Sequence, residues 1–219
     1  MVYLYRSDST LEPDTQKIHI EDIAHALSLI CRAGGHIKRF FSVAQHSINC
    51  AEEAKARGFS ERVQLGCLLH DASEAYISDI TRPVKRKLDA YIKAEQRLQA
   101  FIDHKFMDDA LTYEECEQIK RIDDDMLVCE LNALMQKPVF DQTPQMSASL
   151  QFETLDFELV KQRFLQLFNK LTHKKQDGIL PEGPFLSVGI DGCKGRWLAV
   201  AMSDKGHDIL LFDTIDQAC

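Results

Sequence analysis

Two neighbouring residues, His70 and Asp71, interrupt an apolar segment and have side chains that can bind a metal ion. They follow VQLGCLL, whose apolar residues cover nearly every direction on a helix from Val63 to Ala72. A helix that is apolar all round is normally buried, and buried ionisable groups are costly unless paired, hydrogen-bonded or bound to a metal. The sequence therefore predicts that His70 and Asp71 meet further polar groups in the core.

A further histidine and a further carboxylate meet this requirement on other predicted helices. His46, in SVAQHSINC, lies at the edge of an apolar helical face. In IKRIDDDMLVCELNALM, Asp123 falls inside the apolar stripe at about 100° per residue, whereas Asp124 and Asp125 rotate away from it towards solvent. Imidazole and carboxylate donors together suit Mn, Fe, Co, Ni or Zn. The candidate ligands of one divalent metal ion are therefore His46, His70, Asp71 and Asp123.

Each of these features has an ordinary structural explanation when taken alone. A single histidine at a helix edge is usually a satisfied core or surface residue, and a run of aspartates is usually a solvated face. The combination is more specific, because the histidine, the His-Asp pair and the inward-facing aspartate lie on three different predicted helices.

The same residues, in the order H…HD…D, resemble the signature of the HD-domain metal-dependent phosphohydrolases. The segments HIEDIAHALSLICRAGGHIKRFFSVAQHS and LLHDASEAYISDITRPVK, with the later ID…E, are similar to bacterial and prophage 5′-deoxynucleotidase-like proteins of the YfbR/YfdR type. This resemblance covers roughly residues 17 to 136. It implies an all-α HD-domain helical bundle and one divalent ion held by the four candidate ligands, with water completing the coordination.

The resemblance also implies an enzyme that hydrolyses phosphate monoesters, typically deoxynucleoside 5′-monophosphates. Glu74, four residues after His70, is expected on the same helical face, where it orients the metal-bound water or acts as general base. The alternative is that Glu74 orients a ligand histidine. Asp79 matches the family's second carboxylate and is expected to act as general acid; the alternative is that it caps the turn before Pro83.

Phosphate recognition requires cationic donors. Arg32 matches the family's phosphate-binding arginine, and a planar guanidinium suits bidentate phosphate contacts. Lys85 is a second candidate, His36 is a possible substrate contact, and Arg82 is expected to be a surface charge. Ala33 stands where the deoxynucleotidases have Trp, so the sugar preference is left open.

Hydropathy and capping patterns predict the helices that position these residues. Ser60 is expected to start the His-Asp helix, and TYEE is a capping box before a long helix. The predicted helices span about residues 20–31, 43–57, 61 onwards, a charged segment to 103, 112–136 and 156–174.

The composition changes after about residue 175. We predict an HD domain over residues 1–175, a linker over 176–184 and a short antiparallel β segment over 185–219. The sequence VGIDGCKGRWLAVA resembles the first strands of an RNase H-like nuclease domain, with Asp191 at its first acidic position. We expect a partial domain or appendage, without a second active site.

The net charge, the cysteines and the hydropathy of the chain narrow the range of functions and locations to consider. A net charge of −8 disfavours stable nucleic-acid binding and a membrane-surface role. Seven cysteines, without a CxxC pair, favour reduced thiols. No signal or membrane-spanning segment is evident, so a cytoplasmic location is expected.

The sequence thus favours a metal-dependent hydrolase with a small-molecule nucleotide substrate, most readily a (deoxy)nucleoside 5′-monophosphate. One alternative is a dNTP triphosphohydrolase. The products would distinguish the two enzymes, since a nucleotidase releases orthophosphate and nucleoside whereas a triphosphohydrolase releases polyphosphate. Another is a non-catalytic nucleotide- or metal-binding module. A homodimer is possible by analogy with the deoxynucleotidase-like proteins.

Overall fold

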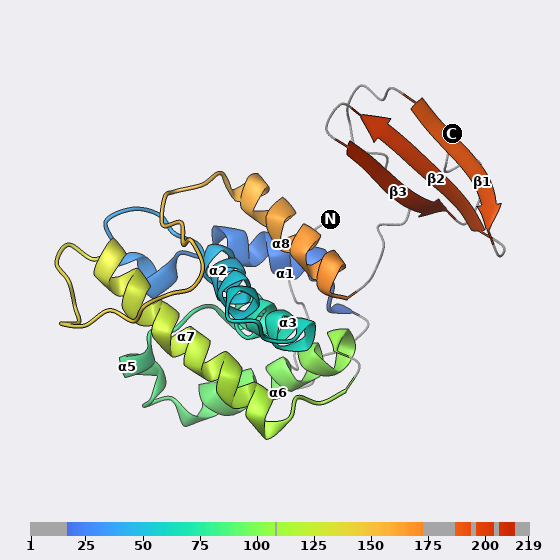
Figure 1. Ribbon diagram of the computed structural model, residues 1–219. Helices are drawn as coiled ribbons and strands as arrows, with labels where there is room; N and C mark the ends of the chain where they lie inside the picture. The colour runs from blue at the N-terminus through green and yellow to red at the C-terminus, as the bar shows by residue number, and fades with distance from the viewer. Residues whose placement is uncertain (1–16, 108, 173–186, 194–195, 204–205, 213–219) are drawn as a thin grey trace. The chain divides into compact units, whose positions relative to one another are not determined.

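The computed structural model describes residues 17–107, 109–172, 187–193, 196–203 and 206–212 (Figure 1). Its contacts divide the chain into two units, Met1–Thr172 and His173–Cys219, which are described separately. The described part of the first unit is mostly helical, which confirms the predicted helical character. The predicted linker 176–184 lies outside the described residues, and the domain boundaries stay a prediction.

The helices begin and end close to the predicted residues. Among the described residues, no helix is both long and apolar enough to cross a bilayer. The helices are α1 (Ile20–Leu29), the 3-10 helix η2 (Arg32–Gly35), α2 (Val43–Ala56), α3 (Glu61–Leu69), α4 (Glu74–Ile77), α5 (Arg82–Lys85), α6 (Asp89–Phe106), α7 (Tyr113–Leu134) and α8 (Phe157–Leu171).

Side-chain caps set several of these boundaries. Ser60 caps α3, and Thr112 with Glu115 forms the capping box that TYEE predicts for α7. Ser42 and Gln45 form a further capping box at the start of α2. Such caps satisfy backbone N–H groups that have no partner within the helix.

The buried core lies between α2 and its neighbours. Helix α2 packs against α3, α7 and α8, and α1 packs against α4 and α8 (Figure 1). Leu27, Leu68, Ile122 and Phe164 are fully buried there. Burying each such side chain contributes about 1.5–3 kcal/mol, so this core fixes the inner faces of α2, α3 and α7 relative to one another.

Helix α3 ends earlier than predicted. The apolar pattern predicts a helix through Ala72, but α3 ends at Leu69 and α4 begins at Glu74. The N–H of Ala72 donates to the carbonyl of Leu69 at 2.9 Å, and that of Glu74 donates to the carbonyl of Asp71 at 3.0 Å. These bonds span three residues instead of four, which is the tighter 3-10 pattern. The His-Asp pair therefore lies in a turn.

The described residues of the second unit form three strands. They are β1 (Ser187–Cys193), β2 (Arg196–Ser203) and β3 (Gly206–Phe212). The sheet is antiparallel in the order β1-β2-β3, with Asp191 opposite Leu198 and Trp197 opposite Phe212.

Candidate metal centre

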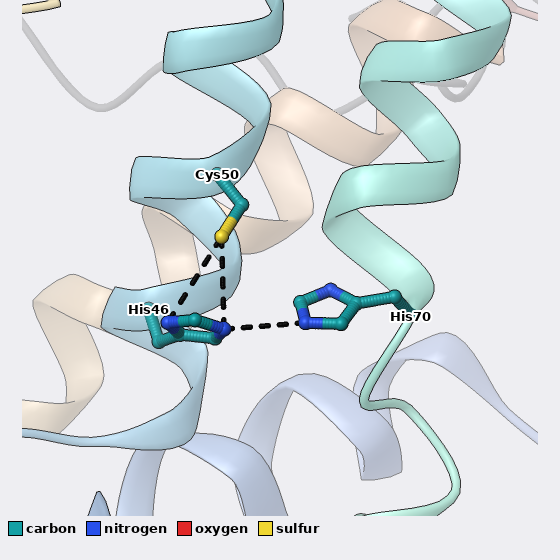
Figure 2. A group of neighbouring side chains, drawn as sticks. All are labelled: His46, Cys50 and His70. Carbon is teal, nitrogen blue, oxygen red and sulfur yellow. Dashed lines mark hydrogen bonds between the residues drawn. The ribbon is translucent and has the colours of Figure 1, made fainter. Parts of the chain in front are cut away.

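Two histidines face one another between α2 and the turn after α3 (Figure 2). Nε2 of His46 lies 3.2 Å from Nε2 of His70. The side chain of His46 is fully buried, and that of His70 is 14 % exposed. Cys50, one turn after His46, lies beside them, and ligand atoms of the three residues are within 4.8 Å of one another. This group is compatible with a metal site.

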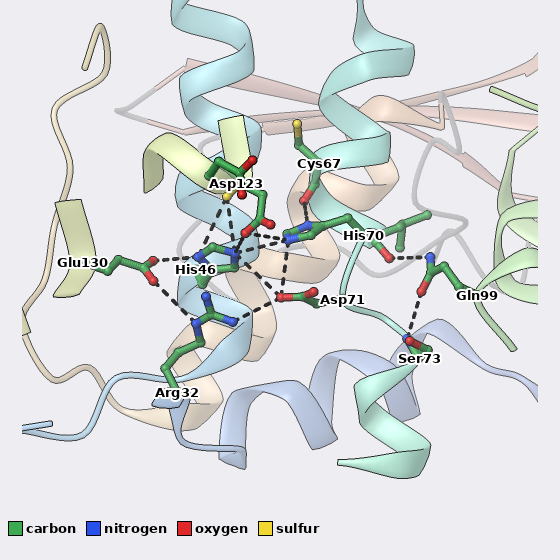
Figure 3. A network of polar contacts seen from close by, with 12 residues as sticks. Arg32, His46, Cys67, His70, Asp71, Ser73, Gln99, Asp123 and Glu130 are labelled. Carbon is green, nitrogen blue, oxygen red and sulfur yellow. Dashed lines mark hydrogen bonds and ion pairs between the residues drawn. The ribbon is translucent and has the colours of Figure 1, made fainter. Parts of the chain in front are cut away.

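Two carboxylates reach the same point (Figure 3). Oδ1 of Asp123 lies 3.3 Å from Nε2 of His46 and 3.7 Å from Nε2 of His70. Oδ2 of Asp71 lies 3.3 Å from Nε2 of His70 and 3.7 Å from Nε2 of His46. The structure thus brings together the four residues that the sequence predicts as ligands.

The spacing of these four atoms fits one metal ion. Ligand atoms about 2.1 Å from an ion lie about 3.0–3.4 Å apart in octahedral or tetrahedral geometry. The five separations that involve a histidine nitrogen run from 3.2 to 3.7 Å, so each carboxylate oxygen lies close to the distance from both imidazoles that a shared ion requires. Two imidazoles with two carboxylates form a mixed N/O donor set of the kind that Mn, Fe, Co, Ni and Zn accept.

Both imidazoles are oriented with a lone pair towards this point. Nδ1 of His46 donates to Oε1 of Glu130 at 2.8 Å, and Nδ1 of His70 donates to the carbonyl of Cys67 at 2.7 Å. A neutral imidazole carries one N–H, so Nε2 of each ring is an acceptor. When both rings are neutral, two lone pairs and two carboxylate oxygens therefore converge, and a cation between them relieves their mutual repulsion.

Glu130 is a site residue that the sequence did not predict. It is 2 % exposed, and besides His46 it contacts Arg32, whose Nε lies 3.5 Å from its Oε2. Nη1 of Arg32 in turn donates to Oδ2 of Asp71 at 3.3 Å. Glu130 follows Asp123 by seven residues on α7, which is about two turns. That spacing puts both residues on one helical face and could have identified Glu130.

Cys50 is less well directed than the carboxylates. Burial raises the pKa of its thiol to about 12. Its sulfur lies 3.6 Å from Nε2 and 3.9 Å from Nδ1 of His46. Because the two distances are nearly equal, the sulfur lies over the imidazole ring and not along the Nε2 lone pair. Cys50 therefore closes one side of the centre, and Asp71 and Asp123 offer the better-directed donors.

The charges at this centre shift one another's protonation. Burial alone lowers the pKa of His70, but Asp71 and Asp123 outweigh it and raise that pKa to about 9. Burial opposes ionisation of Asp71, yet His70 and Arg32 hold its pKa below the usual range. A proton and a divalent ion compete for the same lone pairs, so metal uptake releases protons and is favoured at higher pH.

A cavity of about 470 Å³ opens beside the four convergent atoms. Its lining combines charged and apolar residues. The charged residues include Arg32, Asp71, Glu74, Asp79, Arg82, Lys85, Asp123 and Glu130. The apolar residues include Ala33, Ile37, Ile80, Leu127, Leu131, Leu134 and Met135. A ligand that has both an anionic group and a less polar part matches this mixed lining.

Both predicted catalytic carboxylates line the cavity. Glu74 is 3 % exposed, and its Oε2 has no hydrogen-bond partner among the described residues. Burial, with the charges of Asp71 and Asp79, raises the pKa of Glu74 to about 9. Burial also raises the pKa of Asp79, although Arg32 opposes the shift. Carboxyl groups with raised pKa values in a cavity are typical of acid–base sites.

The predicted phosphate-binding residues Arg32 and Lys85 and the possible substrate contact His36 all line the cavity, but they differ in their contacts with other residues. Lys85 forms an ion pair with Glu95, and His36 lies exposed in the wall. Arg82 is exposed, as expected of a surface charge, with a side chain that is 42 % exposed. Its guanidinium is held by Asp123 and by Asp124, the latter at 2.7 Å, because α5 carries it to the cavity edge beside α7.

Comparison with known proteins finds partial relatives. The chain matches no protein-family model. It is 42 % identical over 89 residues to the uncharacterised protein YfdR of Escherichia coli, covering 41 % of this chain and 47 % of that protein. It is 39 % identical over 102 residues to an uncharacterised protein of Rhodobacter capsulatus, covering 44 % and 52 % respectively. The chain therefore spans about half the length of these relatives, and the expected similarity to the YfdR type is confirmed.

Proposed function

We propose that this protein is a metal-dependent phosphohydrolase of the HD class that removes phosphate from (deoxy)nucleoside 5′-monophosphates. The observation that carries the proposal is the convergence of His46, His70, Asp71 and Asp123 beside a cavity whose lining includes both aspartates. The same cavity holds two carboxyl groups of raised pKa and three cationic side chains. The helical first unit and the resemblance of residues 17–136 support assignment of an HD fold.

The four convergent residues hold the divalent ion in this proposal. Such an ion, when bound, lowers the pKa of a coordinated water and neutralises charge on a phosphate oxygen. Glu130 and the carbonyl of Cys67 keep the imidazoles turned so that Nε2 faces the ion. This arrangement is the usual carboxylate–histidine support of a metal ligand.

Glu74 and Asp79 divide the proton transfers. Glu74 accepts a proton from the attacking water, because a bound divalent ion offsets the charge of Asp71 and so makes the Glu74 carboxylate easier to form. Asp79 donates a proton to the leaving oxygen, a role that its raised pKa favours.

Arg32 orients the phosphate. Among the described residues, its recorded contacts use Nε and Nη1, towards Glu130 and Asp71. A guanidinium has five N–H donors, so donors are left for a phosphate beside the metal. Lys85 adds positive charge to the same wall, and His36 contacts the substrate at the rim. The apolar lining residues suit the sugar and base of a nucleotide.

The proposal also covers the described strands of the second unit, the cellular location and the assembly state. The order β1-β2-β3, with Asp191 in β1, supports a partial RNase H-like domain or an appendage. We assign it no activity of its own. We propose a cytoplasmic protein, with a homodimer as the assembly to test by light scattering.

The test is orthophosphate release from ribo- and deoxynucleoside mono-, di- and triphosphates with Mn²⁺, Co²⁺, Mg²⁺ or Zn²⁺. We expect metal-dependent release from monophosphates, abolished in Asp71→Ala and unchanged in Glu117→Ala, an exposed control on α7. Polyphosphate released from triphosphates alone indicates a dNTP triphosphohydrolase instead. Metal and nucleotide binding without turnover indicates a binding module and contradicts the proposal.

A further inference from the structure

The two neighbouring ligands lie in a segment that lacks regular helical hydrogen bonding. Four residues separate the end of α3 at Leu69 from the start of α4 at Glu74. His70 and Asp71 occupy the first half of this turn. Turn residues are held less firmly than helix interiors, yet ligands must stay within about 0.5 Å of their working positions. An additional restraint on this turn is therefore required.

Gln99 of α6 supplies contacts to both sides of the turn (Figure 3). Its Nε2 donates to the carbonyl of Leu69 at 2.8 Å. Its Oε1 accepts from the backbone N–H of Ser73 at 3.1 Å. These two backbone groups flank residues 70–72. One side chain from another helix thus fixes the distance across the segment that carries both ligands.

Asp103 determines which way the Gln99 amide points. Its Oδ1 accepts the second hydrogen of Gln99 Nε2 at 2.8 Å, one helical turn further along α6. A rotated amide would place Oε1 against two acceptors, the Leu69 carbonyl and the Asp103 carboxylate. Rotation is therefore disfavoured, and the donor and acceptor of Gln99 stay matched to the turn.

We propose that Gln99, oriented by Asp103, is a positioning residue for the metal ligands His70 and Asp71. The inference rests on the proposed function, because it assigns a role in the same metal centre. If Gln99 only linked α6 to this turn, its removal would lower the stability of the fold and leave metal binding unchanged. A positioning role also affects how tightly, and in what geometry, the centre holds an ion.

The test compares Gln99→Met with Gln96→Met, the same substitution at an exposed position one turn earlier on α6. Each purified full-length variant is titrated with Co²⁺, and the visible absorption of bound Co²⁺ is recorded. We expect Gln99→Met to weaken Co²⁺ binding by about 10–100-fold, the usual effect of losing a group that supports metal ligands. We also expect altered absorption bands and a lower kcat with little change in KM. Gln96→Met matches the parent protein.

A pair of variants at Asp103 keeps the inference testable if Gln99→Met does not fold. Asp103→Asn retains an oxygen that accepts from Gln99, and it should stay within about threefold of the parent in Co²⁺ affinity, whereas Asp103→Leu should lose about tenfold. Equal Co²⁺ affinity and equal spectra for the parent, Gln99→Met and Asp103→Leu, with only lower melting temperatures, would overturn the inference.

These outcomes separate the inference from the proposed function. If the parent binds Co²⁺ and Gln99→Met binds it weakly, but no nucleotide is hydrolysed, the positioning role stands and the phosphohydrolase proposal fails. If the parent hydrolyses nucleotides and Gln99→Met binds Co²⁺ equally well, the inference alone fails. A parent protein that binds no Co²⁺ overturns both.

Discussion

Glu130 accepts a hydrogen bond from Nδ1 of His46 at 2.8 Å, and this contact decides which ring nitrogen faces His70 and Asp123. Both side chains are almost fully buried. A buried imidazole whose Nδ1 carries the proton presents Nε2 as a lone pair. The carboxylate also makes that lone pair a stronger donor to a metal. In the proposed metal centre, Glu130 thus orients the ligand His46 and is not itself one of the four ligands.

Removing this carboxylate should weaken the metal centre. In Glu130→Ala, His46 loses its hydrogen-bond acceptor and its ring is free to change tautomer. We expect divalent-ion affinity to fall by about 10–100-fold. Calorimetric titration with Mn²⁺ or Co²⁺ measures the change, and Glu117→Ala on the exposed side of α7 serves as control. Unchanged affinity in Glu130→Ala would contradict the role assigned to this contact.

Much of the site was predictable from helical periodicity. The prediction that Asp123 is the most buried of the three aspartates is confirmed, since its side chain is 20 % exposed against 41 % for Asp124 and 26 % for Asp125. Asp125 nevertheless does not turn freely to solvent, because Arg57 pairs with it at 2.8 Å. Periodicity indicates on which face of a helix a residue lies. It does not indicate which side chain of another helix contacts that residue.

The unpredicted features depend on tertiary contacts between distant residues. Glu130 and His46 are 84 positions apart, and Gln99 meets the backbone of Leu69 across 30 positions. The early end of α3 has the same origin, because local apolar pattern favours continuation of the helix. Contacts to Gln99 supply partners for backbone groups of the turn, and so make that end possible.

Because the pKa of Glu74 is raised in the folded protein, the stability of the fold should decrease as the pH rises. The folded protein holds this proton up to about pH 9, whereas the unfolded chain releases it near 4.5. Stability from Glu74 is therefore fully present below pH 4.5 and is lost as pH rises through this window. In chelator, Glu74→Gln should melt close to the parent at pH 5 and several degrees higher at pH 8.

A differential scanning calorimetry series from pH 5 to 9 measures this difference. Glu52→Gln, at an exposed position of α2, is the control and should not show the same trend. Glu74→Gln should also abolish phosphate release, since an amide cannot accept the proton from water. A melting difference that shrinks as pH rises would show that the sign of the argument is wrong.

Glu53 is a buried carboxylate with a structural role. It accepts from the backbone N–H groups of Ser147 and Ala148 at 2.7–3.0 Å, and Arg57 donates to it at 2.7 Å. Its removal leaves these two backbone N–H groups and Nε of Arg57 without their acceptor, although Arg57 keeps its pair with Asp125; breaking a buried ion pair costs about 3–5 kcal/mol. Glu53→Ala should therefore lose about 3 kcal/mol in urea unfolding. Glu52→Ala, one residue earlier and exposed, should lose almost nothing; a loss below 1 kcal/mol for Glu53→Ala would contradict this role.

The four proposed ligands predict which variants still show a higher melting temperature when a divalent ion is added. An ion present at 100 times its Kd adds about 2.7 kcal/mol, or about 5–10 °C in melting temperature for a protein of this size. Cys50→Ala should keep that rise, because the sulfur lies over the ring of His46 and does not point along its lone pair. Asp71→Asn should lose most of it, because the amide is a weaker metal donor. Melting curves with chelator and with excess Mn²⁺ or Co²⁺ measure both variants. The opposite result, with the rise lost in Cys50→Ala and kept in Asp71→Asn, would assign the ion to His46, Cys50 and His70 instead.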